Sequence, residues 1–150
     1  MNLLPDALAW WNRGYTPLPV KPDGTKSPAV ASWKQHQSAR PDAATIVQWF
    51  TVDTDGIGLV CGGASGGLVM IEFEGRAVTE GLVDAAARAF ADHDALALWE
   101  RVTAGYAERT PSGGLHLYVR VPGGTVPGNT RLARRPSTPD ELAAHPGQRV

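Results

Sequence analysis

The sequence is poor in cysteine and has no long apolar run. Its one cysteine, Cys61, excludes an internal disulfide and a zinc site built from several cysteines. No apolar stretch approaches the roughly 20 residues that a membrane-spanning helix needs, and the N-terminus shows no signal-peptide pattern. We therefore expect a cytoplasmic protein that does not bind membranes.

Length and composition are those of one soluble globular domain. The chain has 150 residues, of which 43% are hydrophobic and 19% are charged. The net charge of -1 conceals an uneven distribution, because residues 51–100 hold nine acids and two bases, whereas residues 101–150 hold seven arginines and three acids. This pattern would suit a site that pairs a metal with a polyanion, and two differently solvated surfaces would explain it equally well.

Hydrophobic periodicity predicts an α+β domain with a largely antiparallel sheet. The predicted helices cover residues 3–13, 42–50 and 79–99, with an interruption at 92–94, and the predicted strands cover residues 15–20, 56–60, 67–74, 106–110 and 115–121. The glycine-rich turn 61–67 predicts a hairpin between the strands on either side of it. We expect residues 1–150 to form a single domain whose basic, loop-rich end, 122–150, is incomplete.

The strand Gly67–Glu74 ends in two acids separated by one residue. Alternation along a strand places Glu72 and Glu74 on one face and the apolar Ile71 and Phe73 on the other. The Cα atoms of the two acids would lie roughly 6.5–7 Å apart, so that the glutamate side chains could share a cation. This spacing predicts a metal site, and the structural alternative is a pair of solvated acids on an open sheet face.

The strand 115–121 alternates fully and follows a tight turn. His116, Tyr118 and Arg120 share one face of it, and aliphatic residues occupy the other. Glycines in the preceding Ser112–Gly114 turn allow a ligand to approach the backbone, whose amides can bind an anion. The pattern predicts a phosphate-binding surface, whereas a simple hairpin is the structural alternative. The sequence does not place this strand beside the acidic one.

These features, taken in order, resemble the N-terminal domain of bifunctional DNA primase/polymerases, the Prim-Pol branch of the archaeo-eukaryotic primase superfamily. The resemblance covers roughly residues 5–121. The first landmark is an N-terminal helix. It is followed in order by Gly14–Leu18, Lys26–Pro28, Trp33, Ile46, Trp49, Gly56–Gly58, Ser65–Gly67, the strand with its acid-x-acid ending, and Thr110–His116. The resemblance implies a catalytic sheet like that of an RNA-recognition fold, with an N-terminal α/β unit packed against it.

The resemblance also implies a catalytic centre. Glu72 and Glu74 would bind the catalytic Mg²⁺ or Mn²⁺ ions, although aspartates are usual at these positions, and His116 would contact the phosphates of the incoming nucleotide. A third carboxylate is expected on a later strand. Asp140 and Glu141 fall in a loop or short helix and are not convincing candidates. If the chain is a fragment, we expect the third acid shortly beyond its last residue, and if it ends at Val150, we expect an incomplete metal site.

The function implied is template-directed nucleotidyl transfer by two metal ions, in DNA priming or extension in a phage or mobile element. Nucleoside triphosphates, a DNA template and primer, and a helicase domain or helicase partner are the expected partners. The residues expected to bind the nucleotide are Ser112, Gly113, Gly114, His116, Arg120 and Lys26. The residues expected to contact the DNA backbone are Arg131, Arg134 and Arg135.

Two other functions fit the same residues. The chain could be a non-catalytic nucleotide- or DNA-binding module that keeps the fold without activity. A metal-dependent phosphohydrolase would use the same two acids, but it is less favoured because no general-base histidine accompanies them.

Overall fold

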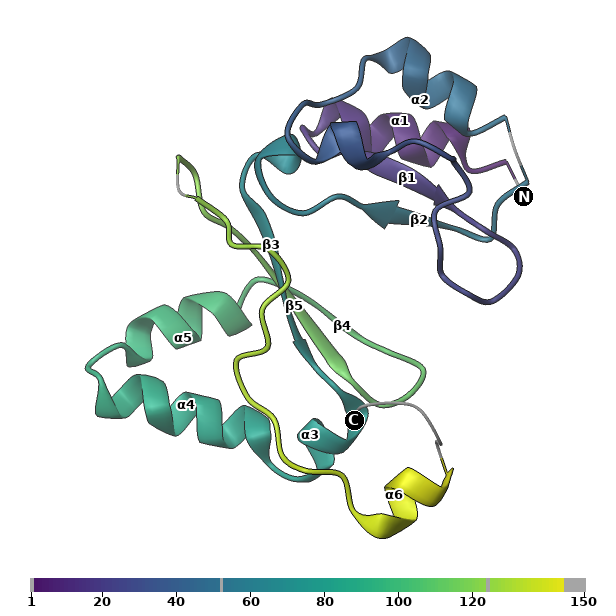
Figure 1. Cartoon of the computed structure of the whole chain (residues 1–150). Helices are drawn as coiled ribbons and strands as arrows, with labels where there is room; N and C mark the ends of the chain where they lie inside the picture. The colour runs from purple at the N-terminus through teal and green to yellow at the C-terminus, as the bar shows by residue number, and fades with distance from the viewer. Residues whose placement is uncertain (1, 52, 124, 145–150) are drawn as a thin grey trace.

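The computed structural model of this chain describes residues 2–51, 53–123 and 125–144, which form two small antiparallel sheets with helices around them (Figure 1). The strands are β1 (Pro17–Val20), β2 (Gly56–Leu59), β3 (Leu68–Phe73), β4 (Tyr106–Arg109) and β5 (Leu115–Arg120). The helices are α1 (Leu4–Asn12), α2 (Ala43–Trp49), α3 (Gly75–Thr79), α4 (Leu82–Asp92), α5 (Leu96–Thr103) and α6 (Pro139–Ala144), and the 3₁₀ turns are η1 (Lys34–Gln37) and η2 (Gly63–Ser65). The predicted α+β class is confirmed.

The first sheet belongs to an N-terminal unit, residues 2–66, in which β1 pairs with β2 while α1 and α2 pack together (Figure 1). Ala7 from α1 and Ile46 from α2 are fully buried between these elements. The carboxylate of Asp42 begins α2 by accepting a hydrogen bond from the Thr45 N–H at 2.8 Å. β1 tolerates its two prolines because β2 is the one strand with which it pairs in the described chain.

The connection from β2 to β3 differs from the predicted hairpin. β2 pairs with β1, whereas β3 pairs with β5, so the two strands belong to different sheets. The Thr16 N–H donates to Ser65 Oγ at 2.9 Å, which holds the turn against the N-terminal unit. Gly66 and Gly67 then adopt φ angles of 64° and 80°, which glycine adopts without strain. The hairpin prediction is wrong because a glycine-rich turn does not specify the partner of the strand that follows it.

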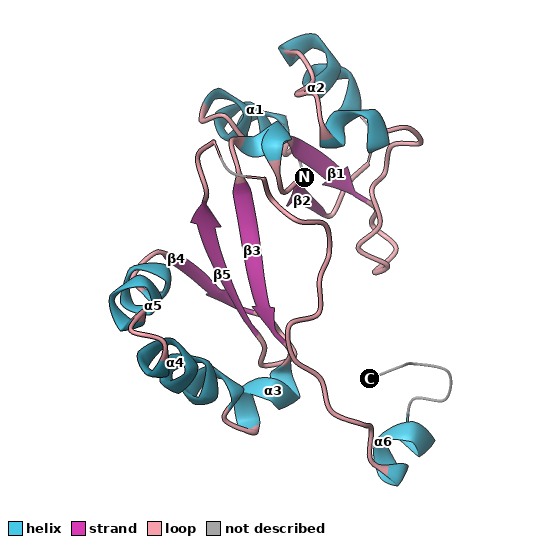
Figure 2. Cartoon of the chain, turned by 60° about the vertical axis from the view of Figure 1, so that its left-hand side comes forward, coloured by secondary structure: helices cyan, strands magenta, loops and turns pink. Residues whose placement is uncertain are grey.

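The second sheet is three-stranded, with β5 in the centre between β3 and β4. One face packs against α4 and α5, as Figure 2 shows, and its core contains Phe73, Trp99 and Leu117. Leu117 is 2% exposed. The alternation predicted for β3 is confirmed, since Phe73 is buried while Glu72 on the opposite face is exposed. The second face is the one that carries the predicted site.

The segment after β5 turns back and leads to α6, which lies beyond α3 in Figure 1. α6 begins with a capping box, in which the Thr138 N–H donates to Glu141 Oε2 at 2.7 Å and the Glu141 N–H donates to Thr138 Oγ1 at 3.3 Å. Arg135 pairs with Glu80 and Glu141 and so ties this segment to the chain that follows α3. Among the described residues, no helix has the length and apolar character that crossing a bilayer requires.

Candidate active site

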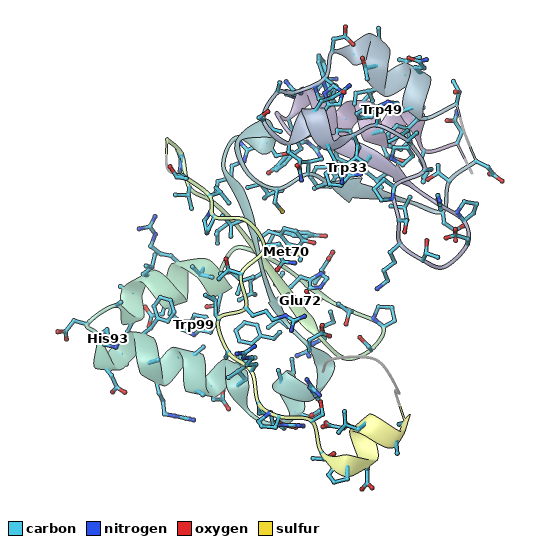
Figure 3. All side chains as sticks on the ribbon, in the orientation of Figure 1. Trp33, Trp49, Met70, Glu72, His93 and Trp99 are labelled. Atoms are coloured by element: carbon cyan, nitrogen blue, oxygen red, sulfur yellow. The ribbon has the colours of Figure 1, made fainter. Side chains whose placement is uncertain are left out.

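Three polar side chains form a row across the three-stranded sheet, on the face opposite the helices. The register pairs Glu72 of β3 with His116 of β5, and His116 with Glu108 of β4. His116 Nε2 lies 3.1 Å from Glu72 Oε1, and His116 Nδ1 lies 2.8 Å from Glu108 Oε1. We call these residues the polar row. Figure 3 shows Glu72 on the side of the sheet away from Trp99.

The two carboxylates favour the charged form of the histidine. Partial burial lowers the pKa of His116, but the hydrogen bonds and charges of Glu108 and Glu72 outweigh burial and raise that pKa above its usual value. The hydrogen bond from His116 lowers the pKa of Glu108 against a smaller effect of burial. The His116 side chain is only 17% exposed, whereas the side chains of Glu72 and Glu108 are 45% and 41% exposed. The polar row therefore presents a histidine whose raised pKa favours its charged form, between two accessible carboxylates.

Tyr118 supports the polar row from the next position on the same face. Its hydroxyl donates a hydrogen bond to Glu108 Oε1 at 2.8 Å, to the same oxygen that contacts His116. Burial, and then the hydrogen bond to Glu108, raises the pKa of Tyr118, so its hydroxyl keeps its proton and acts as a donor. Glu108 thus fixes both the Nδ1 side of the histidine and the ring of the tyrosine.

The predicted phosphate-binding turn lies against the end of the acidic strand. The Thr110 N–H donates to the Gly114 carbonyl at 3.0 Å, which closes the turn. A Cβ atom on Gly75 would lie 2.2 Å from the Ser112 carbonyl oxygen, and one on Gly114 would lie 2.8 Å from the Phe73 carbonyl oxygen. Glycine at both positions lets the two backbones approach. The fold therefore brings the Ser112–Gly114 turn beside the backbone that carries Glu74.

The metal-ligand prediction concerns Glu72 and Glu74. Glu72 lies in β3, and Glu74 lies one residue beyond its end, where it precedes α3 in an extended conformation. Both residues are exposed. Across residues 2–51, 53–123 and 125–144, no three or more His, Cys, Asp and Glu side chains are grouped so that they could hold a metal ion. A metal at this place stays a prediction.

Sequence reasoning missed Glu108. It lies within the predicted strand 106–110, but its role depends on the hairpin register that sets it opposite His116. The closing turn, Thr110–Gly114, could have supplied this register, because counting outward from both ends of the turn pairs the two residues. Glu141, which we did not expect to be the third acid, pairs with Arg135 and Arg76.

Two residues predicted to bind the nucleotide lie away from the polar row. Arg120 stacks over the Tyr15 ring at 4.3 Å and donates to the Arg13 carbonyl at 3.1 Å, which connects β5 to the N-terminal unit. Lys26 is exposed in the loop after β1, where it has a φ angle of 58°. Nucleotide binding by either residue stays a prediction.

The three arginines predicted to contact DNA differ in their surroundings. Arg131 and Arg134 are exposed in the segment between β5 and α6. The Arg135 guanidinium is held by Glu80 and Glu141, and the hydrogen bonds to these carboxylates raise its pKa. The side chain of Arg135 is therefore already neutralised within the chain.

A cavity of about 480 Å³ lies outside the polar row, between the N-terminal unit and residues 126–129. Leu18, Trp33 and Cys61 contribute to its wall. None of the residues predicted for the site lines it. The candidate active site is therefore the open sheet face that carries the polar row and not this cavity.

The chain matches a family model over most of its length. Residues 7–148 match the family model described as "Bifunctional DNA primase/polymerase, N-terminal", which extends beyond the 5–121 range of the predicted resemblance into the C-terminal segment. No curated protein matches the chain. The match spans nearly the whole sequence and includes the acidic strand, the Ser112–Gly114 turn and His116. This chain belongs to the family of bifunctional DNA primase/polymerase N-terminal domains.

Proposed function

We propose that this domain catalyses template-directed nucleotidyl transfer onto DNA, in the replication of a phage or mobile element. The observation that supports the proposal is the polar row, which sets His116 between two carboxylates, on the sheet whose β4–β5 connection is the Ser112–Gly114 turn. A nucleotide brings both a triphosphate, which needs cationic donors, and metal ions, which need carboxylates. The polar row offers both kinds of group on one open face.

The residues present fit a divalent cation whose remaining ligands come from water and the substrate. Mg²⁺ is usually bound by one or two carboxylates together with water and substrate phosphates, so Glu72 and Glu74 form a sufficient protein contribution. These two residues would hold Mg²⁺ or Mn²⁺. When bound, such ions stabilise the attacking and leaving oxygens of an in-line displacement.

The chain's own residues would bind and orient the triphosphate. A phosphate oxygen would replace Glu72 as the acceptor for the Nε2 proton of His116, while Glu108 keeps its contact with Nδ1. The charged imidazole then stabilises negative charge that develops on the phosphates. Ser112 would be the member of the Ser112–Gly114 turn that contacts the same phosphates, because the N–H groups of Gly113 and Gly114 already donate to Thr110.

The exposed arginines would hold the DNA strand without reading its sequence. Arg131 and Arg134 are exposed in the segment between β5 and α6. Hydrogen bonds from arginine side chains to DNA go largely to phosphate oxygens, which carry no sequence information. Lys26 is a further candidate for a phosphate contact from the N-terminal unit. A helicase domain or helicase partner stays a prediction from the family resemblance.

The test is primer extension and nucleotide binding by this chain with Mn²⁺, with both Glu72 and Glu74 changed to glutamine. We expect extension to be abolished and metal-dependent nucleotide binding to fall, because the charges that hold the cation are gone. Glu100→Gln, which removes an exposed acid from α5, is the matched control and should leave both activities unchanged. Extension that persists in the double variant would refute the proposed role of these acids.

A non-catalytic nucleotide-binding module is the second candidate. The observation that favours it is the lack of a three-acid metal cluster among residues 2–51, 53–123 and 125–144. Nucleotide binding that depends on Mn²⁺ and on Glu72, without any extension, would support this candidate over the polymerase.

A further inference from the structure

A second row of side chains lies directly beside the polar row on the same sheet face. The register pairs Met70 of β3 with Tyr118 of β5, and Tyr118 with Tyr106 of β4. Each of these residues is two positions from a member of the polar row, so the two rows lie roughly 6.5–7 Å apart. We call Met70, Tyr118 and Tyr106 the platform.

The platform exposes apolar surface that the fold does not use. Tyr106 is 62% exposed and Met70 is 37% exposed, whereas the core of this sheet lies on the opposite face. The rings of Tyr106 and Tyr118 are 5.6 Å apart, and the Tyr118 ring is fixed by its hydroxyl bond to Glu108. Figure 3 shows Met70 on the same side of the sheet as Glu72. The two rings are tilted by 54° to each other, so the widely exposed Tyr106 ring offers the accessible aromatic face, and Met70 lies in the same row.

We propose that the platform stacks against the nucleobase of the nucleotide whose phosphates contact His116. The inference rests on the proposed function and adds a base-binding site to it. Aromatic side chains on an open sheet are a general means of holding unpaired bases, because every base has a flat π face. The methionine sulfur adds a polarisable contact for the same ring.

The distribution of charge on this sheet face favours a nucleotide as the ligand. The platform carries no formal charge, whereas the polar row holds two carboxylates with a histidine between them. A nucleotide has the same division, with a neutral aromatic base at one end and anionic phosphates at the other. Glu108 joins the two halves, since one of its oxygens contacts both His116 and Tyr118. The chemistry of the face therefore changes along the strands in the order that a single nucleotide requires.

The experiment compares two probes by calorimetric titration in the presence of Mn²⁺. One probe is a purine nucleoside triphosphate, and the other is inorganic tripolyphosphate, which has the phosphates without the base. Tyr106→Ala should weaken binding of the nucleoside triphosphate at least about fivefold, the lower end of what stacking on one base contributes. Binding of tripolyphosphate should not change, because the polar row is intact.

Two variants control for the ring and for exposed apolar area. Tyr106→Phe keeps the stacking ring and should retain the affinity of the unaltered chain. Leu98→Ala removes a side chain that is 50% exposed on α5 and should have no effect. Met70→Ala should weaken nucleoside triphosphate binding in the same direction as Tyr106→Ala.

Several results would overturn the inference. Equal affinity of the unaltered chain and Tyr106→Ala for the nucleoside triphosphate would mean that the platform does not hold its base. Loss of tripolyphosphate binding in Tyr106→Ala would place the ring at the phosphates instead. If Tyr106→Ala bound both probes normally and lost affinity only for a single-stranded oligonucleotide, the platform would contact the template strand and not the incoming nucleotide. Failure of the unaltered chain to bind either probe would refute the proposed function itself, and the platform's role with it.

Discussion

Replacement of Gly75 by alanine should destabilise the domain, although Gly75 is the first residue of a helix. The added Cβ would lie 2.2 Å from the Ser112 carbonyl oxygen, an atom of the backbone, so the Ser112–Gly114 turn would have to move away from Glu74. Overpacking of this kind costs about 1–3 kcal/mol. Alanine in place of glycine returns up to about 1 kcal/mol of helix propensity. The free energy of unfolding should therefore fall by about 1–2 kcal/mol.

Urea unfolding followed by tryptophan fluorescence measures this loss, since Trp99 lies in the core of the same sheet. A fall of about 2–8 °C in Tm should accompany it. Gly63→Ala is the control, because an added Cβ there would meet nothing within 4 Å, and it should be neutral or slightly stabilising. If Gly75→Ala unfolds at the same or a higher urea concentration than the unaltered chain, the close approach of turn and strand is refuted.

Four further predictions follow from the polar row and the arginines. Glu108→Gln should lower the pKa of His116, as measured by NMR titration of the imidazole, because one of the two charges that raise it is lost; an unchanged pKa would contradict the pairing. Because folding raises the pKa of His116, the stability that its contacts contribute should be complete below about pH 6.5 and should be lost as the pH rises through the folded-state pKa. Unfolding measured across this range should show that loss, and His116→Asn should remove it. Loss of both Arg131 and Arg134 should make the slope of log binding constant against log salt concentration, for single-stranded DNA, shallower by about 0.7 per arginine. Arg135→Ala should chiefly speed proteolysis near α6, because the ion pairs of Arg135 with Glu80 and Glu141 are lost.

Alternation along single strands was enough to predict which side chains share a face of the sheet. The period-2 pattern of β5 correctly placed His116 and Tyr118 on one face, with Leu117 in the core. The pattern of β3 likewise separated Glu72 from Phe73. These predictions succeeded because side-chain direction in a strand is a local property of the backbone.

Pairing between distant segments could not be predicted in the same way. The adjacency of Glu72 and His116 depends on β3 pairing with β5 across the intervening helices α3, α4 and α5, and no local pattern specifies it. The false hairpin between β2 and β3 has the same origin. Arg120 was assigned to phosphate because it shares a face with His116, yet it stacks on Tyr15, a partner that only the tertiary fold supplies.

The anchoring of Arg120 has a mechanical consequence. Arg120 lies four residues from His116 on the same face of β5, a span of roughly 13 Å, and its guanidinium bonds to a carbonyl 107 residues earlier in the chain. The same strand therefore carries His116 near one end and the contact with the N-terminal unit at the other. A rotation of that unit would therefore displace β5, and His116 would move with the strand.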